Sequence, residues 1–157
     1  MMAQSKTALV YFSVSGRTQT AAETVGRYLQ LTPVALTAKQ PYPTTGFQQL
    51  VARTDAENLK SQLPEFNPVA LDTVQTLYLG FPTWYHQPPR IVHNFLTTTD
   101  LTGVTVIPFV TSASSRVSES LPYLEKWAAT GHFTISDGFT ANNPDEIAAG
   151  LKDDFPL

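Results

Sequence analysis

The segment 13–18 reads Ser-Val-Ser-Gly-Arg-Thr and places three hydroxyl side chains around one glycine. It follows a short apolar run and precedes an amphipathic stretch, so we expect it at a helix N-terminus, where free backbone amides attract a phosphate. Gly16 permits close approach of the backbone to that group. The segment contains neither Gly-Lys-Ser/Thr nor G-x-G-x-x-G, which favours a monophosphate ligand. An ordinary polar helix cap is the alternative interpretation.

Two other segments carry groups that could surround a ligand. Residues 82–89 combine three prolines with a Trp-Tyr pair, and residues 111–115 are rich in hydroxyl side chains. Each comes at the end of an apolar run, and ligands of open parallel sheets bind beyond the carboxyl ends of the strands. Most aromatic residues pack in the core, but a Trp-Tyr pair in a proline-rich loop is poorly placed to pack under a sheet. We therefore expect all three segments at a ligand site.

The elements that must position these segments alternate between strand and helix patterns. Short apolar runs are typical of strands buried in a parallel sheet. Strands are expected at 7–12, 33–36, 76–81, 104–110 and 132–135. Helices are expected over 18–30, 47–63, after residue 89, over 118–129, and from 144 toward Leu151. This alternation implies an α/β fold in which helices cover both faces of a parallel sheet.

Local signals refine three of these elements. Pro108 cannot donate to a ladder, so we expect it near the end of its strand. Pro122 is expected in the first turn of its helix. Asn143, Pro144 and Glu146 fit the N-cap, N1 and N3 positions of the final helix. The length of 157 residues predicts a single domain over 1–157.

Composition excludes several classes of chemistry. The chain has no cysteine, which rules out disulfides, thiolate metal sites and Cys-ligated iron–sulfur clusters. His86, His93 and His132 show no metal-ligand spacing, so no metal is expected and a redox centre would be a bound cofactor. A net charge of -3 argues against nucleic acid as a partner. The N-terminal apolar run is too short for a signal sequence or a membrane span, which predicts a cytoplasmic protein without a membrane partner.

From about Leu9 to Trp127 the sequence resembles the flavodoxins. Their phosphate loop reads Ser/Thr-x-Ser/Thr-Gly-x-Thr, and its four defined positions are occupied here by Ser13, Ser15, Gly16 and Thr18. Residues 80–85 are similar to the family's aromatic loop, often Gly-Tyr-Pro-Ile-Trp-Trp. Residues 108–115 are similar to its Pro-Phe-x-Thr-Ser-Gly-Gly-Ser loop, with Ala113 and Ser114 where two glycines are usual.

The resemblance implies a flavodoxin-like three-layer sandwich with a five-stranded parallel sheet in the order 2-1-3-4-5. It also implies non-covalently bound flavin mononucleotide (FMN), with Trp84 and Tyr85 stacked on the ring, and with Arg17 at the rim or on the phosphate. The expected cofactor-binding residues are Ser13, Ser15, Gly16, Arg17, Thr18, Pro82, Thr83, Trp84, Tyr85, His86, Thr111, Ser112, Ala113 and Ser115. No catalytic acid or base is needed, because the flavin carries the redox chemistry. His86 could donate a proton, although an exposed surface histidine is the favoured interpretation.

Three functions remain open from the sequence. The first is low-potential electron transfer through FMN to a redox partner protein, by a monomer or a homodimer. The second is NAD(P)H-dependent reduction of quinones or flavins, because the second and third loops contain no acid while His86, Arg90 and Arg116 make their rim neutral to basic. The third is a flavodoxin-like binding domain without functional flavin, prompted by Ala113 and Ser114.

Overall fold

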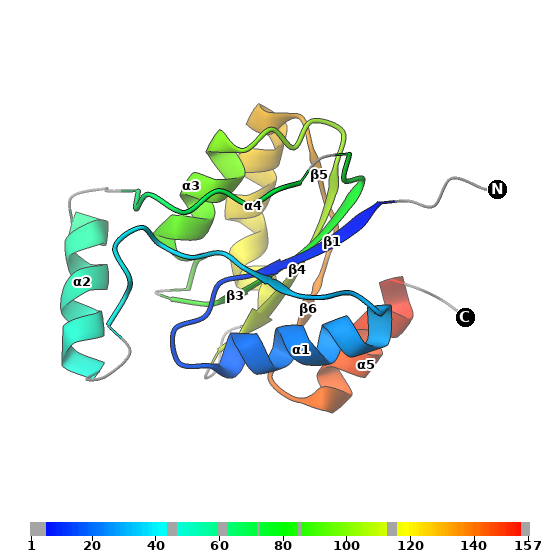
Figure 1. Cartoon of the computed structure of the whole chain (residues 1–157), viewed down its shortest axis with the longest axis horizontal. Helices are drawn as coiled ribbons and strands as arrows, with labels where there is room; N and C mark the ends of the chain where they lie inside the picture. The colour runs from blue at the N-terminus through cyan, green and yellow to red at the C-terminus, as the bar shows by residue number, and fades with distance from the viewer. Residues whose placement is uncertain are drawn as a thin grey trace.

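The structure is a computed structural model that describes residues 6–43, 47–59, 63–71, 73–84, 86–112 and 116–154. A parallel sheet forms its centre. Its strands follow the order β2-β1-β3-β4-β5, and β6 pairs with β4 further along the same edge (Figure 1). The strand bounds are β1 Thr7–Tyr11, β2 Val34–Ala35, β3 Thr76–Pro82, β4 Thr105–Thr111, β5 Thr134–Ile135 and β6 Phe139–Thr140. The predicted α/β fold and the strand order 2-1-3-4-5 are confirmed.

The central strand β3 shows why unbroken apolar runs become strands here. It pairs in parallel with β1 on one side and with β4 on the other. The register against β4 runs from Thr76↔Thr105 to Pro82↔Thr111. All residues from 77 to 81 are buried, because helices cover both faces of the sheet. A strand without a solvent-facing side needs no polar alternation, which accounts for the sequence pattern.

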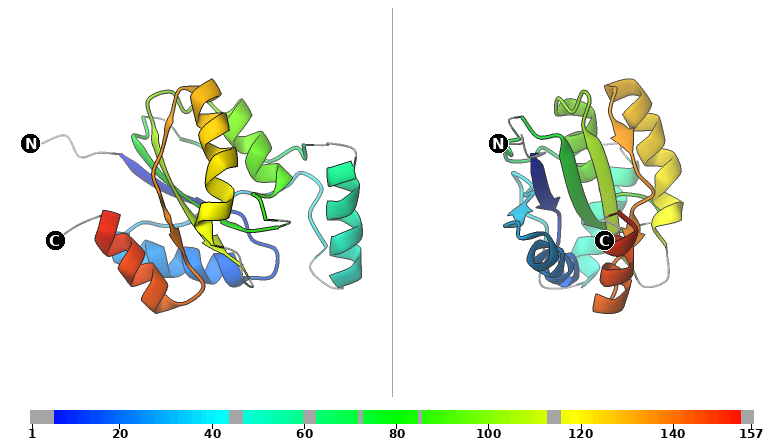
Figure 2. Two further views of the ribbon diagram at one scale, coloured as in Figure 1. Left: turned by 180° about the vertical axis from the view of Figure 1, so that it is seen from behind. Right: turned by 90° about the vertical axis from the view of Figure 1, so that its right-hand side faces the viewer.

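The helices form two layers and one separate element. Their bounds are α1 Arg17–Leu29, α2 Phe47–Leu59, α3 Arg90–Thr98, α4 Val117–Gly131 and α5 Pro144–Asp154. α1 and α5 pack on one face of the sheet, and α3 and α4 pack on the other (Figure 2). α2 covers neither face and stands beyond the carboxyl ends of the strands (Figure 1). Among the helices described, none has both the length and the apolar character that a membrane crossing requires.

Pro108 lies in the middle of β4, so the prediction that it would lie near the end of its strand is wrong. The carbonyls of Val106 and Val110 accept backbone hydrogen bonds from the fifth-strand side. Pro108, two residues from each, faces the same side because hydrogen-bonding direction alternates along a strand. There the fifth strand is interrupted between β5 and β6, and Gly138 crosses the gap with a left-handed φ of 62°. The side of Pro108 that lacks an N–H therefore faces the gap in the ladder, where no backbone donor is needed.

The prediction of Pro122 in the first turn of its helix is also wrong, because α4 begins at Val117 and encloses the proline. A cap formed by Arg116 and Glu119 lies at the start of α4. Glu119 accepts a hydrogen bond from the backbone amide of Arg116 at 3.2 Å, and its own amide donates to the Arg116 carbonyl at 3.0 Å. This cap extends the helix by one residue in the N-terminal direction relative to the predicted start at residue 118.

The predicted cap of α5 is confirmed, since the amide of Glu146 donates to Asn143 Oδ1 at 2.9 Å. The predicted helix over 47–63 corresponds to α2, which runs to Leu59. Residue 63 lies outside the helix, and the intervening residues 60–62 lie outside the described residues. The remaining helices differ from the predicted bounds by one to a few residues at their ends.

Candidate functional site

The three predicted loops meet at the carboxyl ends of β1, β3 and β4. They are the phosphate loop (13–18), the aromatic loop (82–89) and the third loop, predicted at 111–115 and followed by Arg116 directly before α4. The amide of Thr83 donates to the carbonyl of Thr111 at 2.9 Å and joins the aromatic loop to the start of the third loop. The hydroxyls of Thr18 and Thr111 lie 2.7 Å apart and join the phosphate loop to the same strand end. The fold therefore brings the described parts of all three loops together.

The phosphate loop is shaped by Ser13 and Gly16. The amide of Gly16 donates to Ser13 Oγ at 3.2 Å, and Gly16 turns the chain into α1 with a left-handed φ of 94°. A Cβ at Gly16 would meet no atom within 4 Å, so the space over the glycine is open. No side chain caps α1, which leaves its first amides without acceptors among the described residues. An open, uncapped helix N-terminus suits an anion such as a phosphate.

Thr18 is placed beneath the loop rather than on its surface. Its side chain is almost completely buried, and its hydroxyl shares a hydrogen bond with that of Thr111, which is also buried. Two hydroxyls that share one hydrogen bond retain one proton to donate. Thr18 thus ties α1 to β4, and its contact with a ligand stays a prediction.

Arg17 links the phosphate loop to two other segments. Its Nη2 donates to the carbonyl of Ser112 at 3.2 Å and to Asn142 Oδ1 at 3.3 Å. Asn142 lies between β6 and α5 and was not among the predicted site residues. A cavity of about 470 Å³ beside this bridge is lined by the start of α1 and the start of α5. The signal that could have found Asn142 is its position after the last strand, at the carboxyl edge of the sheet.

Trp84 packs against the apolar core from the aromatic loop. Its ring centroid lies 5.6 Å from that of Phe12, nearly perpendicular to it, and 5.6 Å from that of Tyr42. Trp84 and Gln87 exchange two backbone hydrogen bonds of 3.0 Å across a tight turn. His86 occupies this turn with a left-handed φ of 61°, and Tyr85 lies outside the described residues. Trp84 is thus supported by the core on one side and remains partly exposed.

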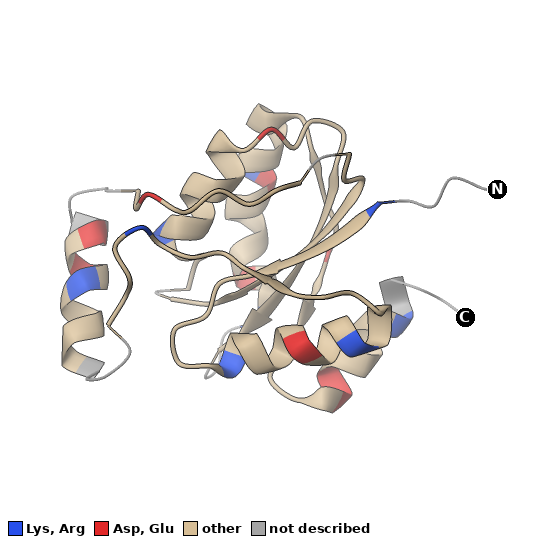
Figure 3. Cartoon of the chain, in the orientation of Figure 1, with Lys and Arg blue, Asp and Glu red and all other residues tan. Residues whose placement is uncertain are grey.

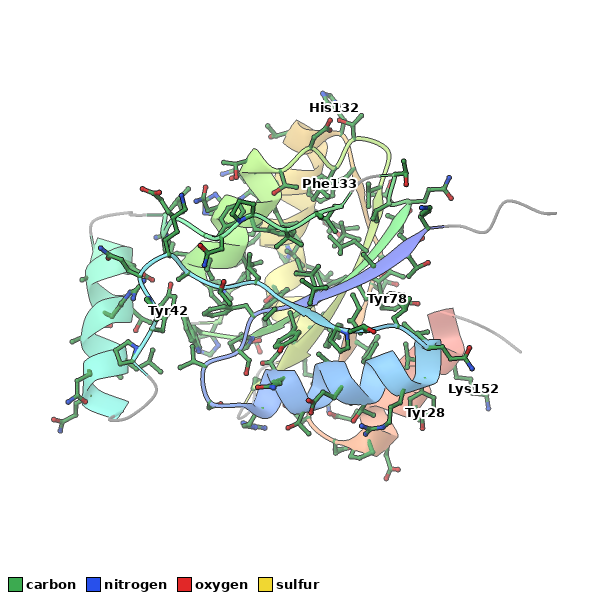
Figure 4. All side chains as sticks on the ribbon, in the orientation of Figure 1. Tyr28, Tyr42, Tyr78, His132, Phe133 and Lys152 are labelled. Carbon is green, nitrogen blue, oxygen red and sulfur yellow. The ribbon has the colours of Figure 1, made fainter. Side chains whose placement is uncertain are left out.

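A polar cluster of Tyr42, Arg53 and Glu57 adjoins Trp84 and holds α2; Tyr42, labelled in Figure 4, and Glu57 are buried, and Arg53 is partly buried. The Tyr42 hydroxyl donates to the Glu57 carboxylate, with its oxygens at 2.9 and 3.0 Å. Arg53 donates to Glu57 Oε2 at 3.2 Å, and its guanidinium lies 3.9 Å above the Tyr42 ring. Burial, together with the charge of Glu57, raises the pKa of Tyr42 far above its usual value of 10.0. Sequence reasoning missed this cluster, because its members are spread over polar-looking stretches of the chain.

We expect Tyr42→Phe to destabilise the protein by about 1–3 kcal/mol at neutral pH, because a nearly buried carboxylate loses a donor. The raised pKa favours the neutral phenol in the folded state. The contribution of the Tyr42 hydroxyl to stability is therefore complete below about pH 10, the pKa of tyrosine in the unfolded chain, and declines as the pH rises above that value. Urea unfolding at pH 7 and above pH 10 should show a smaller alkaline loss for Tyr42→Phe than for wild type. Tyr28→Phe, at an exposed tyrosine, is the control; equal alkaline losses in all three proteins would contradict the assignment.

Acidic side chains lie against two basic residues of the loop rim, His86 and Arg116. His86 is exposed, as favoured from the sequence, and its Nδ1 lies 2.7 Å from Glu119 Oε1. Arg116 Nη1 lies 3.7 Å from Glu146 Oε2. The two acids come from α4 and α5, where charges of both signs are interspersed (Figure 3). At these two positions each basic side chain has an acidic partner.

The third loop is described only at its ends. Ser112 is nearly buried, and its amide donates to Asn142 Oδ1 at 2.8 Å. The predicted binding residues Ala113 and Ser115, together with Ser114, lie outside the described residues. Pro82 ends β3 and is paired with Thr111, so it borders the site from the sheet.

A parallel sheet in this order, with an uncapped phosphate loop between its first strand and first helix, defines the flavodoxin-like class of α/β proteins. The chain belongs to the flavodoxin family, whose model, described as Flavodoxin, matches residues 6–143. No curated protein matches the chain at a significant level. The resemblance inferred from the three loops is therefore confirmed, and FMN, the predicted cofactor, is the cofactor of this family.

Solved structures agree with the family assignment. A protein from Bacteroides eggerthii, provisionally described as a flavoprotein, is 26% identical with a TM-score of 0.82, over 98% of this chain and 99% of that one. A Lactobacillus acidophilus flavoprotein in complex with FMN is 18% identical with a TM-score of 0.74, over 95% and 100% of the two chains. A Fusobacterium nucleatum flavodoxin bound to FMN is 12% identical with a TM-score of 0.57, over 96% of each chain. The last two support the fold alone.

Proposed function

We propose that this flavodoxin family member binds FMN without covalent attachment at the three loops and serves as a one-electron carrier. The observation that supports this most directly is the open, uncapped N-terminus of α1 at Gly16, directly after β1. Ser13, Ser15 and the first amides of α1 would hold the phosphate through neutral groups. Bound FMN would supply the electron-transfer chemistry, while the protein sets its position and its surroundings.

The aromatic loop offers two groups that suit the flavin ring. Trp84 presents a partly exposed indole that is held in place by Phe12 and Tyr42. The Thr83 hydroxyl is buried and has no hydrogen-bond partner among the described residues. An unsatisfied buried hydroxyl costs about 1–3 kcal/mol, so a polar ligand atom at this loop would relieve a penalty already present. Both observations favour a ring site at the aromatic loop.

The charges of the rim favour a carrier over an NAD(P)H-dependent reductase. The reductase hypothesis rested on a neutral to basic rim, without acids in the two loops, that would tolerate the anionic phosphates of a nicotinamide cofactor. In the structure His86 and Arg116 each lie against a carboxylate, which removes the support of these two residues. Steady-state oxidation of NADH or NADPH with a benzoquinone acceptor tests the alternative directly. Sustained turnover would replace the carrier by the reductase.

The first test of FMN binding is an absorption spectrum of the purified protein before and after addition of FMN. We expect a flavin spectrum that persists through desalting. Denaturation should then release FMN in about one-to-one ratio to protein. A colourless protein that ignores added FMN would overturn the proposal and favour a flavodoxin-like domain without flavin.

We expect Trp84→Ala to raise the dissociation constants of FMN and riboflavin about tenfold, because stacking contributes about 0.5–1.5 kcal/mol beyond area burial. Fluorescence titration measures both constants, and urea unfolding reports the loss of core contacts separately. The matched control is Trp127→Ala, because Trp127 stacks on His93 at a centroid distance of 4.2 Å on the α3–α4 surface. Trp127→Ala should lower stability and leave both flavin affinities unchanged. Equal flavin affinities in wild type and Trp84→Ala would remove Trp84 from the site.

A further inference from the structure

The segment from β6 to the first turn of α5 contacts described residues at both ends of the third loop. At one end, Asn142 Oδ1 accepts a hydrogen bond from the amide of Ser112 at 2.8 Å. At the other end, Glu146 Oε2 lies 3.7 Å from Arg116 Nη1. The first residue of α4 is held by the same region, since the amide of Val117 donates to a hydroxyl on β6 at 3.1 Å. One short segment therefore fixes where the loop leaves β4 and where it enters α4.

Asn142 also connects this segment to the phosphate loop. Its Oδ1 accepts from Arg17 Nη2 at 3.3 Å, and the same nitrogen donates to the carbonyl of Ser112 at 3.2 Å. Arg17, Ser112 and Asn142 thus form a closed set of hydrogen bonds. The backbone of Asn142 is fixed in turn, because its amide donates to Glu146 Oε1 at 2.9 Å. The side-chain oxygen is therefore presented from an anchored position, next to the N-terminus of α5.

We propose that Asn142 is a positioning residue for the flavin ring, acting through Ser112. Ser112 is nearly buried, so its backbone amide needs the acceptor that Asn142 supplies. Holding this amide fixes the position of Ser112, which is itself one of the predicted cofactor-binding residues. The inference rests on the proposed flavin site and adds a residue from outside its three loops.

The test compares riboflavin and FMN affinities of Asn142 variants by fluorescence titration. Asn142→Ala removes the acceptor and should weaken both flavins about threefold to tenfold, the effect of one hydrogen bond. Asn142→Asp keeps an acceptor oxygen in the same place and should restore riboflavin affinity to the wild-type value. Riboflavin is the probe for this rescue because it lacks the phosphate that an added carboxylate would repel.

The matched control is Asn143→Ala. Asn143 is the neighbouring residue of the same type, and its side chain caps α5 by accepting from the amide of Glu146. Its loss should lower stability in urea and leave riboflavin affinity unchanged. Amide hydrogen exchange of the flavin-free protein gives an independent measurement. The Ser112 amide should exchange faster in Asn142→Ala than in wild type, Asn142→Asp or Asn143→Ala.

The outcomes separate this inference from the function on which it rests. A wild-type protein that binds neither flavin would overturn the proposed function and the inference with it. A wild-type protein that binds both, with unchanged affinity in Asn142→Ala, would overturn the inference alone. Equal weakening in Asn142→Ala and Asn143→Ala, or no rescue by Asn142→Asp, would also overturn it, because the effect would then come from the stability of α5.

Discussion

Replacement of Ser15 by Asp is expected to raise the FMN dissociation constant about a hundredfold, equivalent to about 2.7 kcal/mol, while the riboflavin constant stays unchanged. Ser15 is exposed and directly precedes the open Gly16 and the uncapped start of α1. A carboxylate there would repel the phosphate, with about 4 kcal/mol between unit charges 4 Å apart near a protein surface. It would also compete for the same helix amides, since acidic residues are favourable at helix N-termini. Parallel titrations with FMN and riboflavin measure the effect.

Gln30→Asp is the matched control for Ser15→Asp. It makes the same change of charge at the other end of α1, about 20 Å away along a helix of this length. Gln30 has a left-handed φ of 56°, which Asp tolerates better than most residues. FMN affinity should be that of wild type, because charges this far apart are screened by salt. If both substitutions weakened FMN equally, or if Ser15→Asp weakened riboflavin as well, the phosphate would not lie at this loop.

Gly138→Ala should lower the free energy of unfolding by about 3 kcal/mol or more. Gly138 crosses the gap between β5 and β6 at a positive φ, and a Cβ there would collide with the carbonyl oxygen and the ring of Pro108. Neither partner can move easily, because Pro108 lies in the interior of β4. The midpoint of urea unfolding measures the loss. Flavin affinity of the folded variant is measured separately.

Gly103→Ala separates the collision from the backbone strain. Gly103 also has a positive φ, 78°, but a Cβ there would meet no atom within 4 Å. Its substitution should therefore destabilise by only about 1–2 kcal/mol, the cost of a left-handed conformation. Equal losses of unfolding free energy in Gly138→Ala and Gly103→Ala would contradict this prediction. They would show that β4 moves around Pro108 to make room for the added Cβ, so that close packing does not require a glycine at the break in the fifth strand.

Predictions from sequence were right where the information is local. The buried strand β3 and the cap at Asn143 depend on residues next to one another, so their patterns determine the outcome. The position of Pro108 was predicted wrongly because a proline is tolerated inside β4 only where the neighbouring fifth strand is interrupted, about 30 positions later in the sequence. Nothing within 104–110 signals that interruption.

The candidate site divides in the same way. The phosphate loop is one contiguous segment, and its hydroxyls and glycine could be read directly. The contact between His86 and Glu119 spans 33 positions, and that between Ser112 and Asn142 spans 30. Such pairs are assembled by the sheet topology, so the acidic partners at the rim and the contacts of Asn142 could be seen only in the folded chain. Charge counted along the loops alone leaves out the acidic partners that α4 and α5 bring to His86 and Arg116.

Because of where α2 lies, substitutions on its outer surface and on its inner surface should have different consequences. A helix that covers neither face of the sheet takes no part in strand register, and here it is tied to the body through Tyr42, Arg53 and Glu57. Substitutions along its outer surface are therefore expected to leave the sheet and the phosphate loop unchanged. Substitutions at its inner surface affect the packing of Tyr42 against Trp84. At the proposed flavin site, substitutions on the inner surface of α2 are accordingly expected to alter flavin binding, whereas those on its outer surface are not.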